Sequence, residues 1–130
     1  MDPVVHFELP AEDRERMAAF YTAAFGWQTQ FHGPEMGNYT VVTTTESEGS
    51  RPTTPGAIDG GFFLRTSDPA SHAPSLVIAV ADIDASLRAI EQAGGTVAGA
   101  PQEIPGVGTY AGFHDTEGNR LSLLRPLPPA

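Results

Sequence analysis

The sequence predicts an α+β fold that consists of two βαβββ modules. Two observations support this prediction. Each half of the 130-residue chain contains a strand-like run that leads into a helix-like run and ends at glycine. The two copies also keep the same register, because Asp13 and Asp82 are 69 residues apart, as are Gly26 and Gly95. A strand–helix unit repeated in so short a chain indicates two similar modules that share one core.

The first module, at about residues 1–66, is predicted to contain one helix over residues 12–25, which ends at Gly26. Acidic residues lie in its first turn, where they face the positive end of the helix dipole. Its apolar residues recur at helical spacing, so we expect a buried face that includes Phe20 and Phe25. Alternating or β-branched runs predict strands over residues 4–9, 27–31, 39–45 and 62–64.

The second module, at about residues 74–126, is predicted to contain a helix over residues 82–93. Residues 115–119 form a turn with a glycine that is free to adopt positive φ, which predicts a hairpin. Residues 46–56, which belong to the first module, are rich in Ser, Gly, Thr and Pro and predict an exposed loop. The strands predicted for the second module span residues 76–80, 96–98, 109–114 and 120–124.

The composition is that of an ordinary globular protein, with 40% hydrophobic and 18% charged residues. The net charge of −9, with seven Lys and Arg residues, disfavours binding to nucleic acid and to anionic membranes. The chain has no cysteine, which excludes disulfides and zinc–thiolate sites. No basic and apolar leader begins the chain, and no apolar stretch approaches membrane-spanning length, so we expect a cytoplasmic protein.

Three segments carry a resemblance to a known family: FYTAAFGW at residues 20–27, VADIDA at residues 80–85 and DTEGNRLSL at residues 115–123. Together they resemble the vicinal oxygen chelate superfamily, which includes glyoxalase I, extradiol dioxygenases, fosfomycin-resistance proteins and bleomycin-binding proteins. The resemblance implies a single glyoxalase-like domain in which each module curls into a half-barrel sheet and the two sheets enclose a ligand cavity. It also implies a homodimer, because a second copy commonly completes the cavity in this family.

The resemblance further implies four positions at which enzymes of the family hold a divalent metal with His, Gln or Glu. In this sequence the four positions carry His6, Ser75, Phe62 and Ser122. A divalent ion needs three or more His or carboxylate ligands, and this set supplies one. We therefore expect neither a metal nor another cofactor. The alternative is a rearranged metal site made by His6, Glu8 and His114.

His6 and Glu8 are two residues apart on one predicted strand, so their side chains point to the same face. A carboxylate beside an imidazole raises the imidazole pKa and orients its tautomer, which suits proton transfer next to a carbonyl group. These two are the candidate catalytic residues, and the alternative is that they are polar groups of a cavity wall. Aromatic residues on strands suit a flat organic ligand but are also typical of a core. Besides His6 and Glu8, the candidate ligand-binding residues are Trp27, Tyr39, Phe62, Tyr110, His114 and Ser122.

Two functions are compatible with these residues. The first is a small-molecule-binding protein that holds an aromatic organic ligand in a metal-free cavity, as the drug-binding members linked to antibiotic resistance do. The second is a lyase, isomerase or dioxygenase that uses a non-standard metal site or the pair of His6 and Glu8. Arg120 shares the strand face of Ser122, so it either holds a carboxylate or phosphate or is a solvated residue at the strand end.

Overall fold

The structure of the chain, a computed structural model, describes residues 1–49 and 51–128. The chain forms two compact units. The N-terminal unit consists of His6–Pro74, and the C-terminal unit combines Met1–Val5 with Ser75–Ala130. The first strand therefore contributes to both units.

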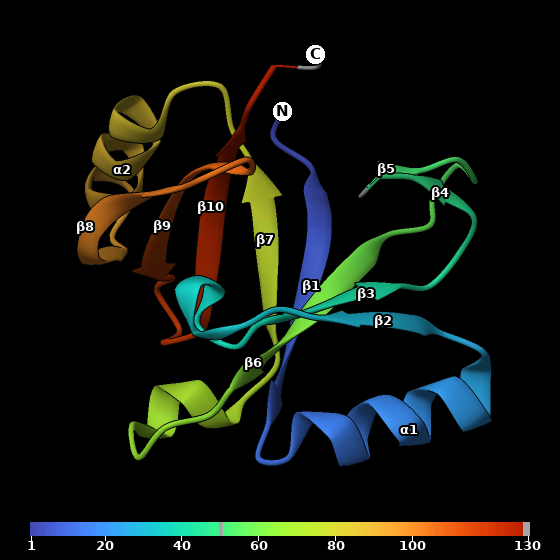
Figure 1. Cartoon of the computed structure of the whole chain (residues 1–130). Coiled ribbons are helices and arrows are strands. Elements are labelled where there is room, and N and C mark those ends of the chain that lie inside the picture. The colour runs from blue at the N-terminus through green and yellow to red at the C-terminus, as the bar shows by residue number, and fades with distance from the viewer. Residues whose placement is uncertain (50, 129–130) are drawn as a thin grey trace. The chain divides into compact units, whose positions relative to one another are not determined.

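The N-terminal unit has a four-stranded sheet with the order β2-β3-β6-β1 (Figure 1). The first and last of these strands along the chain, β1 and β6, pair in parallel, and the other neighbours pair antiparallel. A separate two-stranded hairpin, β4 and β5, lies within the segment that the sequence predicted as a loop. The elements are β1 (Val4–Ala11), α1 (Arg14–Phe25), β2 (Gln28–Phe31), η1 (Pro34–Met36), β3 (Thr40–Thr43), β4 (Ser47–Glu48), β5 (Arg51–Pro52), β6 (Asp59–Leu64) and η2 (Pro69–His72).

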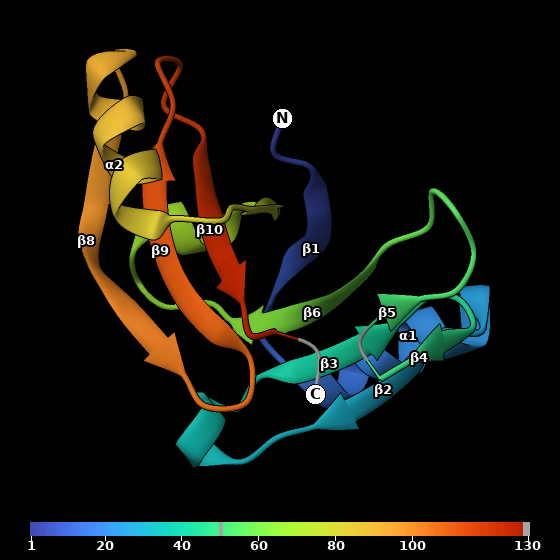
Figure 2. The same ribbon diagram turned by 90° about the horizontal axis from the view of Figure 1, so that it is seen from above.

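The C-terminal unit repeats this connectivity with the strand order β7-β10-β9-β8. Here β7 and β10 pair in parallel, β9 pairs antiparallel with both of its neighbours, and α2 lies along the sheet (Figure 2). The predicted α+β fold with two βαβββ repeats is therefore confirmed. The elements are β7 (Ser75–Ala79), α2 (Ile83–Gln92), β8 (Thr96–Ile104), β9 (Gly108–His114) and β10 (Arg120–Pro126).

The two helices begin at equivalent residues of the repeat. Asp13 caps α1 by accepting a hydrogen bond from the backbone N–H of Arg16, and Asp82 caps α2 through Ala85, each at 3.0 Å. Because the cap fixes the first turn, α1 begins two residues later than the sequence predicted. Neither helix of the described residues is long and apolar enough to cross a membrane.

Each unit has its own hydrophobic core beneath its helix. In the C-terminal unit, Ile83 and Leu87 of α2 pack on Phe113. In the N-terminal unit the expectation for α1 was wrong, because Phe20 and Phe25 are 59% and 64% exposed. This helix is apolar on several sides, so the spacing alone did not identify the buried face. The buried residues of the N-terminal core are Ala11, Ala18, Val42 and Phe62, with Phe7, Leu9, Met17, Tyr21 and Trp27 packed around them.

The turn predicted at residues 115–119 forms the hairpin between β9 and β10, as expected. The length of β8, in contrast, differs from the prediction. Asp115 accepts hydrogen bonds from the backbone N–H groups of Glu117 and Asn119, both at 2.9 Å. The side chain of Asn119 also bonds Asp115 at 2.8 Å, and these bonds lower the pKa of the Asp115 carboxyl. Strand β8 continues to Ile104, past a break in its register, whereas the sequence predicted an end near residue 98.

We predict that Phe62→Ala destabilises the protein by about 3–5 kcal/mol, because it removes a large side chain that is 1% exposed. Chemical denaturation measures this free energy of unfolding. Phe63→Ala is the matched control, since the half-buried Phe63 points to the opposite face of the same strand. Equal losses for the two variants would contradict the assignment of Phe62 to the core.

Candidate functional site

The sheet of the N-terminal unit has two chemically different faces, because successive side chains of a strand point to opposite sides. One face carries Phe7 and Phe62 and packs under α1. The other carries His6 and Glu8 of β1, both half-buried. The sequence therefore predicted correctly that these two residues share a face.

The strand register extends this second face across the whole sheet of the unit. Glu8 lies opposite Gly61 of β6, Gly61 lies opposite Val41 of β3, and Val41 lies opposite Gln30 of β2. Residues that are directly opposite in a sheet point to the same side. We call this side, which α1 does not cover, the N-terminal polar face.

Tyr39 lies across the middle of the N-terminal polar face. Gly61 has no side chain, and a β-carbon at that position would collide with the Tyr39 ring and hydroxyl group. The hydroxyl oxygen of Tyr39 is 3.1 Å from Nε2 of His6 and 3.0 Å from Oε2 of Glu8. Glycine at position 61 thus allows one tyrosine to connect the two candidate residues of β1.

The three side chains form a hydrogen-bond chain with a defined direction. Tyr39 donates its hydroxyl proton to Glu8. The Tyr39 oxygen then accepts from Nε2–H of His6, so the neutral imidazole carries its proton on Nε2 and its basic lone pair on Nδ1. Such a chain orients an imidazole for binding or for proton transfer.

Burial lowers the pKa of His6, and the charge of Asp59 offsets this effect only in part. The sequence had suggested that a neighbouring carboxylate would raise this pKa. The expectation was wrong because desolvation of the imidazolium outweighs the attraction of the nearby carboxylate. His6 is therefore held in its neutral form at neutral pH.

Asp59 is a member of this face that the sequence analysis missed. It is 3% exposed and lies opposite His6 in the pairing of β6 with β1. Its carboxylate accepts hydrogen bonds from the Thr44 backbone N–H at 2.8 Å and from the Ser47 hydroxyl at 2.6 Å. Asp59 therefore ties the base of the β4–β5 hairpin to the sheet. It lies between the predicted loop at residues 46–56 and the predicted strand at residues 62–64, where no sequence pattern marked it.

The backbone before Tyr39 fixes where its ring can go. Gly37 and Asn38 both adopt the left-handed conformation, with φ of 64° and 56°. Arg14 of α1 donates hydrogen bonds from one guanidinium nitrogen to the carbonyl oxygens of His32 and Asn38, at 2.6 and 2.8 Å. The connection that leads into β3 is thus held at both ends, and Tyr39 enters the strand in a fixed position.

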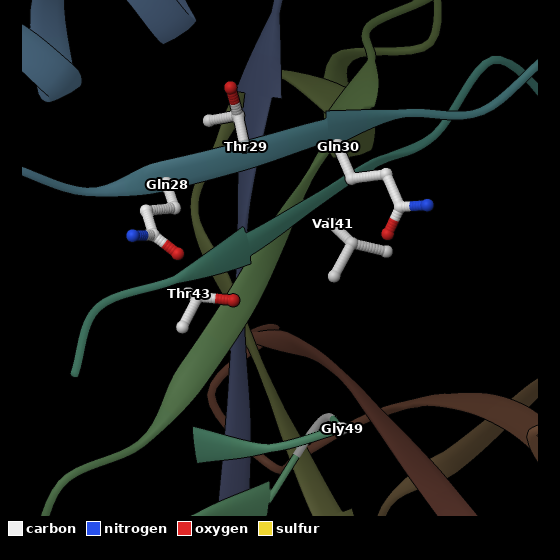
Figure 3. Close-up of a pocket in the computed structure, with 6 residues that line it drawn as sticks. All are labelled: Gln28, Thr29, Gln30, Val41, Thr43 and Gly49. Carbon is white, nitrogen blue, oxygen red and sulfur yellow. The ribbon is translucent and has the colours of Figure 1, made fainter. Parts of the chain in front are cut away.

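An open hollow of about 350 Å³ lies on the same sheet face (Figure 3). In Figure 3 the side chains of Val41 and Thr43 point from β3 toward Gly49, whereas Thr29 points away from them. Gln28 and Gln30 of β2 contribute side-chain amide groups to this part of the polar face. The lining residues of the hollow are Gln28, Thr29, Gln30, Val41, Thr43 and Gly49.

The C-terminal unit has a corresponding face, opposite the one that α2 covers. It carries Tyr110 and His114 of β9 and Ser122 of β10. The Tyr110 hydroxyl is hydrogen-bonded to the Ser122 hydroxyl, and Ser75 donates to the Arg120 carbonyl oxygen at 2.8 Å. We call this side the C-terminal polar face.

Two predicted ligand-binding residues lie elsewhere. Phe62 is buried in the core of the N-terminal unit. Trp27 packs against the same core, with its ring stacked on Tyr21 at 4.5 Å between centroids and 5.5 Å from the Phe7 ring. The expectation that Phe62 and Trp27 line a ligand cavity was therefore wrong, because their positions place them on the side of the sheet that the helix covers.

The residues at the family's metal positions do not fit a divalent ion. In the N-terminal unit, Gly61 of β6 lies opposite Glu8 of β1. In the C-terminal unit, Ser122 of β10 lies opposite Val77 of β7, which is the equivalent of Glu8 in the repeat. Gly61 rather than Phe62 is thus the counterpart of Ser122, and it has no donor atom. Within each unit, the described residues 1–49 and 51–128 bring together no group of three His, Asp or Glu side chains that could hold a metal ion.

Comparison with known proteins identifies relatives over nearly the whole chain. A family model described as Glyoxalase/Bleomycin resistance protein/Dioxygenase superfamily matches residues 4–123. A glyoxylase-like domain-containing protein of Didymella fabae is 34% identical over 119 residues, which cover 89% of this chain and 88% of that protein.

A second relative is the anthracycline biosynthesis protein DauV of Streptomyces sp. (strain C5), which is 31% identical over 132 residues. The match covers 92% of this chain but 45% of DauV, so the chain spans less than half the length of that relative. Among solved structures, methylmalonyl-CoA epimerase from Mycobacterium tuberculosis has a TM-score of 0.66 at 16% identity, over 96% of this chain and 88% of that one. This last likeness concerns the fold alone.

We predict that His6 makes the free energy of unfolding depend on pH below its ordinary pKa of 6.5. Because the folded pKa is lowered, the unfolded chain binds more protons in this window, and stability falls as the pH drops from 6.5 toward the folded pKa. The His6 contribution to the slope reaches at most about 1.4 kcal/mol per pH unit. Urea denaturation between pH 7 and pH 5 should show a smaller loss for His6→Gln than for the wild type. His72→Gln, which replaces an exposed histidine of η2, is the control substitution.

Proposed function

This chain is a member of the Glyoxalase/Bleomycin resistance protein/Dioxygenase superfamily, and we propose that it binds a small planar organic molecule on its N-terminal polar face without a metal ion. The observation that carries the proposal is the hydrogen-bond chain from His6 through Tyr39 to Glu8. Half-buried polar groups in a fixed geometry are the usual means by which a site orients a ligand.

The chemistry of the face favours a ligand with a flat ring and with oxygen substituents. The Tyr39 ring lies against the backbone of Gly61 and provides an aromatic surface for a planar ligand. The amides of Gln28 and Gln30 can donate to carbonyl oxygens and accept from hydroxyl groups. The relationship to an anthracycline biosynthesis protein supports the same class, since anthracyclines are planar polycyclic compounds rich in carbonyl and hydroxyl groups.

The donor set supports a metal-independent function. Of the four family positions, only His6 carries an imidazole, and Ser75, Gly61 and Ser122 replace the remaining ligands. Hydroxyl groups and a glycine do not compensate the charge of a divalent ion. Oxygenase chemistry that depends on such an ion is therefore disfavoured among the activities of the superfamily.

The hydrogen-bond chain also favours a second candidate, a metal-independent isomerase or lyase. In its neutral form His6 can take a proton from a carbon next to a carbonyl group, through the basic Nδ1. Tyr39 and Glu8 would stabilise the imidazolium that forms, because its charge is shared along the hydrogen bonds. The proton then returns to another carbon of the substrate, or a leaving group departs.

For the binding function we predict that quinizarin, a planar dihydroxyanthraquinone, binds saturably, and that Tyr39→Phe weakens the binding by about 1–2 kcal/mol. This is the scale of a lost hydrogen bond to a polar or charged partner. The affinity is measured from the intrinsic fluorescence of quinizarin. Trp27 fluorescence is a poorer reporter, because Trp27 packs on the opposite side of the sheet.

Tyr21→Phe is the matched control, since it removes a hydroxyl group from a tyrosine of the helix-packed core. It should leave the affinity unchanged, and treatment with EDTA should do the same. Equal weakening by Tyr39→Phe and Tyr21→Phe would contradict the proposed location. Loss of binding after EDTA, together with about one metal per chain in elemental analysis, would contradict the metal-free site.

For the proton-transfer function we predict that the protein accelerates exchange of the hydrogens next to the carbonyl of α-tetralone with deuterium from the solvent. His6→Gln should slow this exchange at least about 100-fold, the scale of removing a general base. Mass spectrometry of the recovered ketone measures the exchange, and His72→Gln is the control. A rate equal to that in buffer would exclude proton transfer for this ketone and leave the binding function in place.

A further inference from the structure

The side chain of Arg120 lies over the C-terminal polar face. Arg120 begins β10, and its guanidinium group extends across Gly112 of β9. A β-carbon at position 112 would collide with the guanidinium group, so the glycine leaves the space that this group occupies. Arg120 is half-buried, and its head group therefore lies against the sheet rather than in open solvent.

The guanidinium group of Arg120 has no partner among the described residues. The ion pairs of residues 1–49 and 51–128 join Arg16 and Arg65 to Glu12, on the surface. The chain has sixteen acidic residues and seven basic ones, so an arginine without a carboxylate is unexpected on charge alone. A half-buried cation without a partner is only partly hydrated, which makes it a strong site for an anion.

The strand register explains why no internal carboxylate reaches Arg120. Alternation along the strands and pairing between them determine which residues share its face. None of these residues is acidic, and several can donate a hydrogen bond. They are Thr96, Ala98, Gln102 and Ile104 of β8, Gly108, Tyr110, Gly112 and His114 of β9, Ser122, Leu124 and Pro126 of β10, and Ser75, Val77 and Ala79 of β7.

We propose that the C-terminal polar face binds the carboxylate of an organic acid, which Arg120 holds through two parallel hydrogen bonds. The planar fork of a guanidinium group matches the two oxygens of a carboxylate. His114 lies directly opposite Arg120, and the linked hydroxyl groups of Tyr110 and Ser122 follow along the same strands. A single cation on this face suits one negative charge better than the two charges of a phosphate.

This carboxylate site is in the C-terminal unit and does not depend on the ligand proposed for the N-terminal polar face. Because the Arg120 guanidinium group lies against the backbone of Gly112, binding at this site can be followed through the NMR signal of a single residue. The probes are benzoate and its neutral analogue benzamide, which have the same planar shape and differ in charge. The readout is the amide NMR signal of Gly112, which lies directly beneath the guanidinium group.

Benzoate should shift the Gly112 signal saturably, whereas benzamide should bind at least about tenfold more weakly, since it lacks the charge-assisted bonds. Arg120→Gln should weaken benzoate binding by a similar factor, and Arg120→Lys should restore part of it as a point charge without the fork. Arg125→Gln is the matched control, because it removes the same charge from an exposed residue on the other side of β10. It should leave the benzoate affinity unchanged.

Three outcomes would overturn this proposal. Benzoate and benzamide could bind equally, Arg125→Gln could weaken benzoate as much as Arg120→Gln does, or inorganic phosphate could bind more tightly than benzoate. If Arg120→Gln fails to fold, the benzoate affinity of Arg120→Lys, which keeps the positive charge, is compared with that of the wild type instead. Failure of quinizarin binding alone would refute the proposed function of the other unit and would leave the carboxylate site standing.

Discussion

Parallel pairing between the first and last strand of each repeat is the constraint on which both units depend. Parallel neighbours cannot be joined by a tight turn, so a helix and further strands must intervene between β1 and β6 and between β7 and β10. The helix then covers one face of the sheet. Alternate residues of the first strand are thereby assigned either to the core or to the opposite, polar face, and His6 and Glu8 belong to the latter.

Local chemistry made much of this architecture predictable. Asp13 and Asp82 cap the two helices because a short carboxylate reaches the free N–H groups of the first turn. Asp115 closes the last hairpin in the same local way. Such interactions join residues that are close in the sequence, so spacing alone reveals them. The face shared by His6 and Glu8 was predictable for the same reason.

The remaining parts of the site depend on contacts between distant residues. Tyr39 reaches Glu8 only because Gly61, which is remote from both in the sequence, leaves room for its ring. Phe62 was expected on the polar face, but Gly61, one residue earlier, takes that place, and a shift of one residue moves a side chain to the other face. Asp59 was not predicted because its partners, Thr44 and Ser47, lie 15 and 12 residues away in the sequence, and no local spacing indicates these contacts.

The two repeats keep one backbone plan but carry opposite electrostatic character on their polar faces. In the N-terminal unit, Glu8 and Asp59 surround a histidine whose burial keeps it neutral. In the described part of the C-terminal unit, the strand residues of the equivalent face include one arginine and no acid. Each face places one long side chain, Tyr39 or Arg120, over a glycine of a neighbouring strand. A polar face with a neutral histidine therefore suits proton transfer, whereas a polar face with an arginine suits a negatively charged group, as we propose for the two units.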